Sequence, residues 1–300
     1  MNPLTILDGG MGRELQEIGA PFSQPLWSAQ ALLEAPQYVI QAHQHFVDAG
    51  AEILITNSYA CVPFHLGQAR FEQQGYGLAA LSGQLARQVA DESSQAPIVA
   101  GAIPPPMGSY RPDLFDADVA QPIIQTLFDA QDSYVDIWIV ETICSLLELE
   151  TIHRVMQQTD KPCYYAFSLS DDNNGQATLR SGESVSEAIL LLSRMNATGV
   201  MFNCSVPEVM DQALIAAKDV MTTLDHPLEL GVYANNFAPI SSEHEANDTL
   251  HTLRELSPQG YLDYAKRWHA LGASIIGGCC GIGPKHIQAL SEWKTTLNRA

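Results

Sequence analysis

The chain has 300 residues and is 46% hydrophobic, enough for a sizeable core, and its length suits one large α/β barrel without demanding a second domain. Its 34 acidic and 15 basic residues give a net charge of −19, which argues against nucleic acid or an anionic membrane as a partner, since either needs a basic patch. No apolar stretch approaches the ~20 residues that cross a bilayer, and no signal peptide is visible at the start, so we expect a cytoplasmic protein that acts on small molecules.

The chain begins with an alternation of apolar runs and helical patterns. Residues 4–7 are apolar and end at Asp8, and a helical pattern that follows Pro36 ends at Gly50. The next apolar run, 52–56, ends at Asn57. The same patterns predict later strands at 98–103, 137–140, 163–167, 200–202, 228–233 and 273–278, and helices at 77–93, 118–134, 146–158, 185–196, 207–223, 260–271 and from Pro284 onward.

Eight strands, each followed by a helix, predict an α/β fold: a (β/α)8 TIM barrel that forms a single domain over 1–300. In such barrels the catalytic groups lie at the carboxyl ends of the strands. Two long loops follow strands at that end, at 104–113 and 237–259, and long loops there are usually lids or substrate contacts. The functional side chains are therefore expected where the strands end.

Cysteines mark the ends of two predicted strands. The last strand runs into Gly277–Gly281, which contains the adjacent Cys279 and Cys280, and Cys204 follows the strand at 200–202. Strands six and eight are separated by one strand, so their ends converge over the barrel axis. Three thiols around one point are typical of a catalytic zinc site, and soft thiolates favour Zn²⁺ over Mg²⁺ or Ca²⁺. Because successive side chains on a strand point to opposite faces, the chain must turn at the glycines for both thiols to face one ion.

The cysteine content favours a metal or catalytic role over disulfides. Six cysteines without framework spacing are typical of a reducing compartment. A disulfide between the adjacent Cys279 and Cys280 would be strained. Cys61, Cys163 and Cys144 are interpreted as spare, and only Cys144 lies just past a strand end of interest.

Polar residues end most of the predicted strands. Each is ordinary loop chemistry by itself, but a barrel places all strand ends around one mouth. Gly9 and Gly10 add backbone N–H groups that favour a carboxylate, although an Asp-Gly-Gly segment also forms ordinary turns. The strand-end residues are Asp8, Asn57, Glu141, Thr142, Ser168, Asn203, Cys204, Asn235, Cys279 and Cys280.

Four motifs stand at these strand ends: Asp8-Gly9-Gly10-Met11, Glu141-Thr142-Ile143, Phe202-Asn203-Cys204 and Gly277-Gly278-Cys279-Cys280-Gly281. In order and spacing they resemble the homocysteine S-methyltransferase family, which includes S-methylmethionine- and betaine-dependent enzymes and the homocysteine domain of cobalamin-dependent methionine synthase. The resemblance spans nearly the whole chain. It implies a zinc-dependent (β/α)8 barrel enzyme that methylates homocysteine to methionine.

The resemblance also implies roles for these residues. Cys204, Cys279 and Cys280 would bind Zn²⁺, and the catalytic group would be the zinc-activated substrate thiolate rather than a further side chain. The implied substrate contacts are Asp8 and Glu141 for the ammonium, the backbone of Gly9 and Gly10 for the carboxylate, and Asn235 near the site. Thr142 and Asn57, at neighbouring strand ends, complete the predicted substrate-binding set.

Several alternatives stay open. The methyl donor is S-methylmethionine, S-adenosylmethionine, betaine or a methyl carrier, and a cationic donor would favour aromatic contacts, for which Trp27 and Tyr59 are candidates. The acceptor is homocysteine or another thiol or selenol. A zinc hydrolase usually has His and carboxylate ligands. A non-catalytic zinc or redox thiol protein would lack the carboxylate pair of Asp8 and Glu141. The oligomeric state is open.

Overall fold

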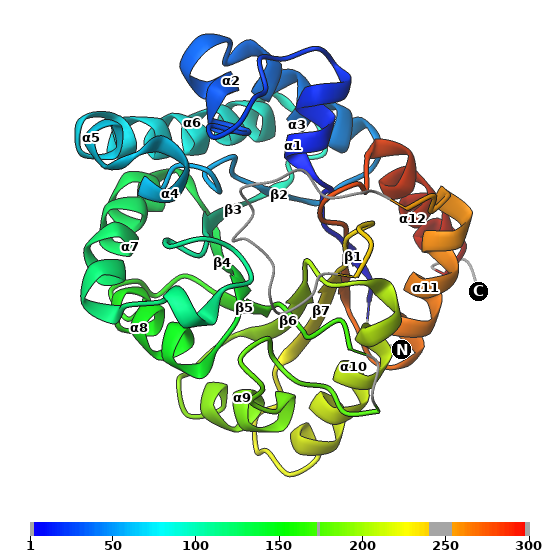
Figure 1. Cartoon of the computed structure of the whole chain (residues 1–300). Helices are drawn as coiled ribbons and strands as arrows, with labels where there is room; N and C mark the ends of the chain where they lie inside the picture. Colours follow the sequence, from blue (N-terminus) through cyan, green and yellow to red (C-terminus); the bar gives the residue numbers. More distant parts are fainter. Residues whose placement is uncertain (1–2, 173–174, 240–253, 298–300) are drawn as a thin grey trace.

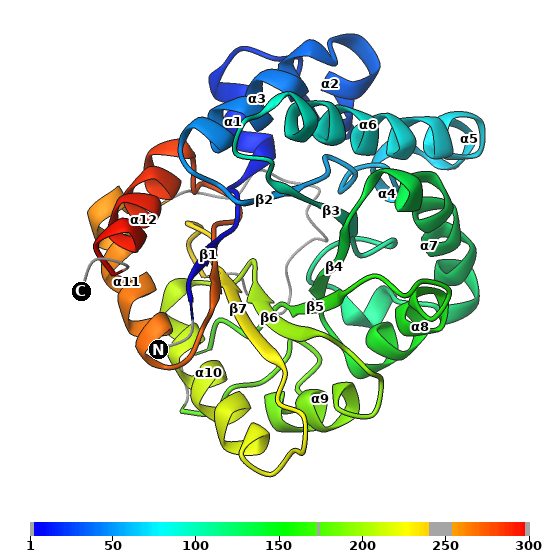
Figure 2. The same ribbon diagram turned by 180° about the vertical axis from the view of Figure 1, so that it is seen from behind.

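The computed structural model describes residues 3–172, 175–239 and 254–297, and its centre is a ring of eight parallel strands (Figures 1 and 2). The strands are β1 (Thr5–Ile6), β2 (Ile53–Ile55), β3 (Ile98–Ile103), β4 (Ile137–Ile143), β5 (Cys163–Phe167), β6 (Gly199–Asn203), β7 (Glu229–Tyr233) and β8 (Ile275–Ile276). Hydrogen-bonded neighbours follow the order β1-β8-β7-β6-β5-β4-β3-β2. A parallel bridge between Leu7 and Ile53 closes the ring between β1 and β2. The predicted (β/α)8 fold is confirmed.

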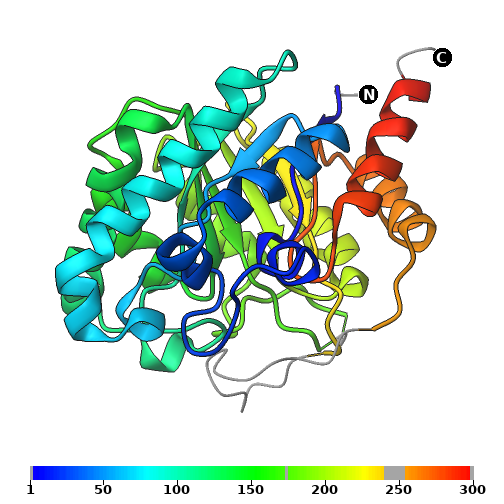
Figure 3. The same ribbon diagram turned by 90° about the horizontal axis from the view of Figure 1, so that it is seen from above.

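Helices surround this ring on the outside (Figure 1). The longer ones are α3 (Gln37–Asp48), α6 (Tyr76–Glu92), α7 (Ala117–Gln131), α8 (Leu146–Met156), α9 (Val185–Leu192), α10 (Pro207–Met221), α11 (Pro258–Ala270) and α12 (Pro284–Leu297). Their starts are defined locally: the Ser184 hydroxyl and the Glu187 carboxylate form a capping box at α9, and the Asp116 carboxylate caps α7. The start of β1 and the end of α12 lie at the same end of the barrel (Figure 3).

The structure also contains short helices that the sequence patterns did not predict. They are α1 (Met11–Glu17), α2 (Ala29–Glu34), α4 (Pro63–Leu66), α5 (Gln68–Arg70) and a π-helical turn at Phe71–Gly75. Apolar periodicity is a weak signal in such short segments, because it needs a window of roughly 11–18 residues. One of these helices, α1, matters for function because it begins at the barrel mouth.

Alternation along the strands divides the core into two parts. On β4, Ile137 and Ile139 pack inside the barrel, whereas Trp138 and Val140 pack against the outer helices. The same alternation turns Glu141, the next inward position, toward the barrel mouth. The sequence therefore uses the regular pleat of a strand to place a carboxylate at the top of the core.

Among the described residues, no helix is long and apolar enough to cross a membrane.

Candidate active site at the barrel mouth

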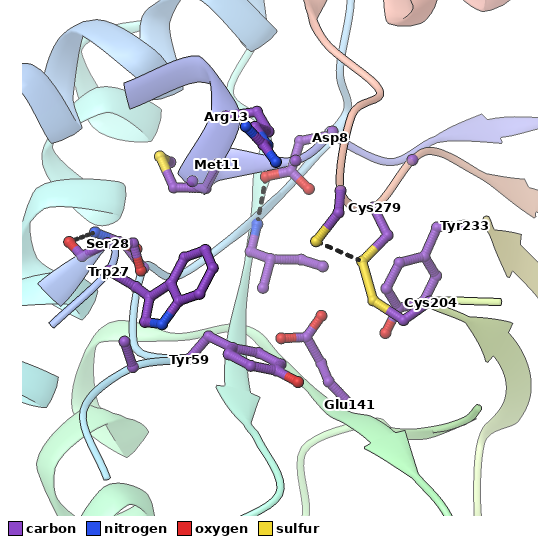
Figure 4. Close-up of a pocket in the computed structure, with 18 of the residues that line it drawn as sticks. Asp8, Met11, Arg13, Trp27, Ser28, Tyr59, Glu141, Cys204, Tyr233 and Cys279 are labelled. Carbon is purple, nitrogen blue, oxygen red and sulfur yellow. Dashed lines mark hydrogen bonds between the residues drawn. A yellow bond between two sulfur atoms is a disulfide. The ribbon is translucent and has the colours of Figure 1, made fainter. Parts of the chain in front are cut away.

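The carboxyl ends of the strands surround a cavity of about 150 Å³. Carboxylates, sulfur atoms and aromatic rings approach it from different sides (Figure 4). Its polar and sulfur-bearing lining consists of Asp8, Arg13, Ser28, Thr56, Asn57, His65, Glu141, Cys204, Cys279 and Cys280, and its aromatic lining of Phe22, Trp27, Tyr59, Tyr110, Tyr233 and Phe237. The cavity thus combines groups that bind a cation, groups that bind a soft metal and an apolar aromatic wall.

Two buried carboxyl groups, Asp8 and Glu141, face this cavity and are only 2% and 7% exposed. Burial raises the pKa of Glu141 to about 7, and burial together with the nearby Glu141 raises the pKa of Asp8. A backbone N–H bond from Ile55 to Asp8 Oδ2 (2.8 Å) opposes part of that rise and fixes the carboxylate. Burial of two like charges is costly, and a cation between them removes that cost.

Tyr233 adds a hydroxyl beside Glu141. It projects inward from β7 and is buried. The hydroxyl is close enough to lower the pKa of Glu141 against the larger effect of burial, but it does not have full hydrogen-bond geometry with any of the residues described. Tyr233 is not among the predicted site residues, although its inward position at the end of a strand is a signal for one.

The adjacent thiols Cys279 and Cys280 meet the cavity because the chain makes a tight turn after β8. The Ile282 amide bonds to the Cys279 carbonyl at 3.0 Å, and Gly281 has φ +81°, as a turn of type II requires at its third residue. The two sulfur atoms are 4.0 Å apart. The predicted turn at the glycines is therefore present, but Gly281 supplies the unusual backbone angle.

Gly277 and Gly278 have a different role from the one predicted. Strand β8 ends at Ile276, and neither glycine has a positive φ. A Cβ atom on Gly277 would lie 2.6 Å from the Asp8 carbonyl oxygen, and one on Gly278 would lie 2.1 Å from Ile282 Cγ2. These glycines therefore permit close packing of the cysteine turn against the segment that carries Asp8.

Cys204 reaches the same point from β6. Its backbone has φ +46°, a left-handed conformation that costs on the order of 1–3 kcal/mol for a residue other than glycine. This change of direction ends the strand alternation and turns the thiol toward Cys279. Together the three cysteines have their sulfur atoms within 4.8 Å of one another.

In this structure Cys204 and Cys279 form a disulfide, with their Cα atoms 5.7 Å apart, and Cys280 is free. The sequence favoured a metal or catalytic role for the cysteines over disulfides, and this form differs from that expectation by containing the Cys204–Cys279 bond. The disulfide forms because β6 and β8 converge, which brings together two thiols that are 75 residues apart in the sequence. Metals bind thiolates rather than disulfide sulfur, so the reduced form is the one competent for metal.

The reduced cluster fits a zinc ion. Tetrahedral zinc with bonds of about 2.3 Å separates its sulfur ligands by roughly 3.8 Å, close to the 4.0 Å between the sulfur atoms of Cys279 and Cys280. Three thiolates form the donor set of a soft metal and leave a fourth position for substrate. The other cysteines, Cys61, Cys144 and Cys163, are buried outside this group.

The glycine motif after β1 does not present its amides as simply as predicted. The Gly10 amide donates to the Ile282 carbonyl at 2.9 Å. The next amides, those of Met11 and Gly12, begin α1, where the first-turn N–H groups lack partners within the helix, and both residues line the cavity. Carboxylate binding by the backbone of Gly9 and Gly10 stays a prediction, and the geometry adds the start of α1 to it.

The remaining predicted substrate contacts divide into one cavity residue and two residues behind the wall. Asn57 lines the cavity and donates to the Ser28 carbonyl at 3.1 Å. Thr142 and Asn235 are fully buried and do not line it. Asn235 Oδ1 accepts from the Phe237 amide at 3.1 Å. Direct contact of these residues with substrate stays a prediction.

Two residues that the sequence analysis did not single out complete the site. Arg13 on α1 lines the cavity and opposes the rise, to about 11, that burial produces in the pKa of Cys280. Tyr110, from the predicted long loop at 104–113, packs against the sulfur cluster with Phe237. The loop at 237–259 is described only at its two ends, so the prediction for 240–253 lies outside the described residues.

The fold is a (β/α)8 barrel, and its mouth places three cysteines beside a buried pair of carboxylates. Together, fold and site indicate the class of enzyme to which this protein belongs. The chain belongs to the homocysteine S-methyltransferase family, whose model matches residues 5–293. The family membership inferred from the four sequence motifs is thereby confirmed.

Individual relatives are similar over almost their whole length. The homocysteine S-methyltransferase of Escherichia coli (strain K12) is 29% identical, with 96% of this chain and 94% of the relative covered. The selenocysteine methyltransferase of Astragalus bisulcatus is 26% identical, with 95% and 90% covered. The homocysteine S-methyltransferase YbgG of Bacillus subtilis (strain 168) is 27% identical, with 98% and 96% covered.

Solved structures with the same fold include two forms of the homocysteine methyltransferase MmuM from Escherichia coli. The metallated form has a TM-score of 0.77 and 25% identity, with 97% of this chain and 96% of that chain covered. The oxidized form also has a TM-score of 0.77, with 28% identity and the same coverage.

Proposed function

We propose that this chain is a zinc-dependent methyltransferase that moves a methyl group to the sulfur of homocysteine and so forms methionine. The observation that carries the proposal is the convergence of three thiols and two buried carboxyl groups on one cavity. The family match over residues 5–293 and the metallated relative support it. A zinc store or redox protein needs the thiols but has no use for the buried carboxylate pair.

In this proposal the two ends of homocysteine are held by different parts of the mouth. Asp8 and Glu141 take the ammonium, whose charge offsets the mutual repulsion of their carboxylates. The amides at the start of α1, with Arg13 beside them, take the carboxylate. These contacts aim the substrate sulfur at the cysteine cluster and order the reacting atom before transfer.

Cys204, Cys279 and Cys280 would hold the zinc ion. When bound, zinc lowers the pKa of a thiol near it and so supplies a sulfur nucleophile at neutral pH. The chain itself contributes a mouth lined by aromatic rings, which excludes water from the sulfur. Keeping the three thiols reduced suits the cytoplasm, which is the location we propose.

The donor in this proposal is a sulfonium or a related cationic methyl compound. The homocysteine sulfur forms a bond to the methyl carbon while the bond from that carbon to the donor heteroatom breaks. The electron pair of the broken bond stays on the heteroatom, which thereby loses its positive charge. Trp27 and Tyr59 both line the cavity, with Trp27 across from the sulfur atoms, and their aromatic rings favour a cationic donor (Figure 4). A neutral methyl carrier would gain less from these rings.

A panel of labelled donors tests the function. Reduced, zinc-loaded protein is incubated with homocysteine and methyl-labelled S-methylmethionine, S-adenosylmethionine, betaine or methyltetrahydrofolate, and label in methionine is followed. We expect transfer from a sulfonium donor above all. Absence of label from every donor would rule out the proposed reaction.

The acceptor needs the same test, because one relative is a selenocysteine methyltransferase. A selenol is more acidic than a thiol and fits the same centre. Competition between homocysteine, selenohomocysteine and selenocysteine for one labelled donor measures the preference as a ratio of kcat/KM values. We expect homocysteine and selenohomocysteine, which have the longer side chains, to be preferred over selenocysteine. The site's contacts to the ammonium and to the sulfur or selenium fix the distance between those two groups of the substrate.

Homocysteine binding should weaken in acid. Burial raises the pKa of Glu141 to about 7 in the free protein, so lowering the pH below 7 protonates the carboxylate and removes its attraction for the ammonium. Between pH 8 and pH 6 we expect the affinity for homocysteine to fall about tenfold for this group alone. Glu141→Gln should remove this component from the pH profile of kcat/KM, and a profile that is unchanged in the variant would contradict the role of Glu141.

A further inference from the structure

The side chain of Asn203 connects the ends of β4 and β6. It is fully buried, its Oδ1 accepts a hydrogen bond from the Thr142 amide at 3.0 Å, and its Nδ2 donates to Thr142 Oγ1 at 3.0 Å. Strand β5 lies between the two strands, so the backbone ladders join β4 and β6 only through it. The Asn203 carboxamide spans that gap directly.

Both connected residues adjoin a residue of the proposed site. Thr142 follows Glu141, and Asn203 precedes Cys204. The bond therefore ties the carboxylate proposed for the substrate ammonium to a thiol proposed for the metal. A shift at either strand end would change the distance from the ammonium pocket to the sulfur cluster.

The backbone at this connection is held in a conformation that its residues disfavour. Thr142 has φ +58° and Cys204 has φ +46°. A left-handed conformation is a true outlier for a β-branched residue such as threonine, and it persists only where surrounding contacts hold it. The pairing of β4 with β5 also shifts in register between Val140 and Ile143, so regular ladder bonds do not fix Thr142.

The same connection reaches the aromatic wall. The Thr142 hydroxyl, which accepts from Asn203, is near enough to the Tyr59 hydroxyl to affect its ionisation, and the Tyr59 hydroxyl is 2.6 Å from Ser109 Oγ. Tyr59 lines the cavity, so the Thr142 hydroxyl lies near the side where the donor is proposed to bind.

We propose that Asn203 is a positioning residue that holds Glu141 and Cys204 in register through its two hydrogen bonds to Thr142. The inference rests on the proposed function, since it assigns the alignment of that function's substrate clamp and thiol cluster to one carboxamide. It adds a residue that contacts neither substrate nor metal. Asn203 acts on the site by holding Thr142 in its left-handed conformation.

Asn203→Ala tests this role in the reduced, zinc-loaded protein. Misplacement of reacting groups by about 1 Å costs roughly 10²-fold, so we expect kcat/KM for homocysteine to fall 10–100-fold. Homocysteine KM should rise more than donor KM, and a zinc chelator should remove the metal faster than from the wild type. Adding Thr142→Gly to Asn203→Ala should recover part of the loss, because glycine adopts a positive φ without penalty.

Gln131→Ala is the matched control. Gln131 is also a fully buried carboxamide, with its Oε1 accepting from Thr56 Oγ1 at 2.6 Å and its Nε2 donating to the Ala102 and Leu127 carbonyls. Its loss should lower thermal stability while homocysteine KM and zinc retention stay within about twofold, since it holds neither Glu141 nor Cys204. Equal effects of the two substitutions on homocysteine KM and zinc retention would show general destabilisation and would overturn the inference.

A second variant covers the case in which Asn203→Ala does not fold. Thr142→Val keeps the shape of the side chain and the hydrogen bond from the backbone N–H of residue 142 to Asn203 Oδ1. It removes the hydroxyl that accepts from Asn203 Nδ2. We expect a smaller rise in homocysteine KM, about threefold, with faster zinc loss, and unchanged values of both would overturn the inference. If the wild type forms no methionine, the proposed reaction fails, and zinc retention with calorimetric homocysteine binding still decides the role of Asn203.

Discussion

Replacing Cys279 with serine is expected to remove most of the bound zinc and to lower methionine formation by on the order of 10³-fold, equivalent to roughly 4 kcal/mol of lost stabilisation. Serine keeps the size of the side chain but is a poor ligand for a soft metal, and the two remaining thiols, Cys204 and Cys280, cannot complete the three-thiol set. Zinc is measured by atomic absorption on reduced protein, because Cys204 and Cys279 pair as a disulfide when oxidised.

Cys163→Ser is the control for this substitution. Cys163 is also buried, but it begins β5, at the end of the strand opposite the cavity. Among the described residues, its thiol donates a hydrogen bond to the Lys161 carbonyl at 3.4 Å and packs in the outer core. This variant should keep one zinc ion per chain and near wild-type activity. If Cys279→Ser retains zinc as fully as Cys163→Ser does, the proposed ligand set is wrong.

Glu141→Gln should raise the KM for homocysteine roughly 10²-fold while the donor KM changes less than about threefold. The substitution keeps the shape of the side chain but replaces a buried carboxylate with a neutral amide, which no longer balances an ammonium. Separate titrations of the two substrates in the labelled-methyl assay give the two KM values. Glu141→Ala should show the same preference for the homocysteine KM, with an added loss of packing.

Glu148→Gln is the matched variant on the adjacent helix. Glu148 is another buried acid, whose pKa burial raises to about 8, and it accepts from the Cys144 amide at 2.8 Å. Its carboxyl group lies outside the cavity, so its neutralisation should leave homocysteine KM within about twofold. An equal rise in both KM values for Glu141→Gln would instead place Glu141 in a general structural role.

Much of this architecture is predictable from the sequence for simple physical reasons. Buried parallel strands produce apolar runs, amphipathic helices produce a period of 3.6, and their repetition specifies a barrel. The barrel then forces all strand ends to one mouth. For that reason the convergence of Cys204 with Cys279 and Cys280 follows from topology before any distance is measured, and the geometry confirms it.

Other features depend on distances that no local pattern contains. The Gly10 amide donates a hydrogen bond to the carbonyl of Ile282, which lies 272 positions later in the sequence. The short helix α1 has too few residues for a clear periodicity, so the cavity role of Arg13 went unrecognised. Thr142 and Cys204 have backbone angles that their residue types disfavour, and sequence propensity therefore points away from the observed conformation.

If the three thiols hold a catalytic zinc ion, methyl transfer must depend on the metal. Reduced protein is assayed for methionine formation from homocysteine and its best labelled donor, then stripped with a chelator, assayed again, and reloaded with Zn²⁺. We expect activity to be present at first, to fall at least about 100-fold on stripping and to return with one zinc ion per chain. Undiminished methionine formation by the metal-free protein would contradict the catalytic role of the metal.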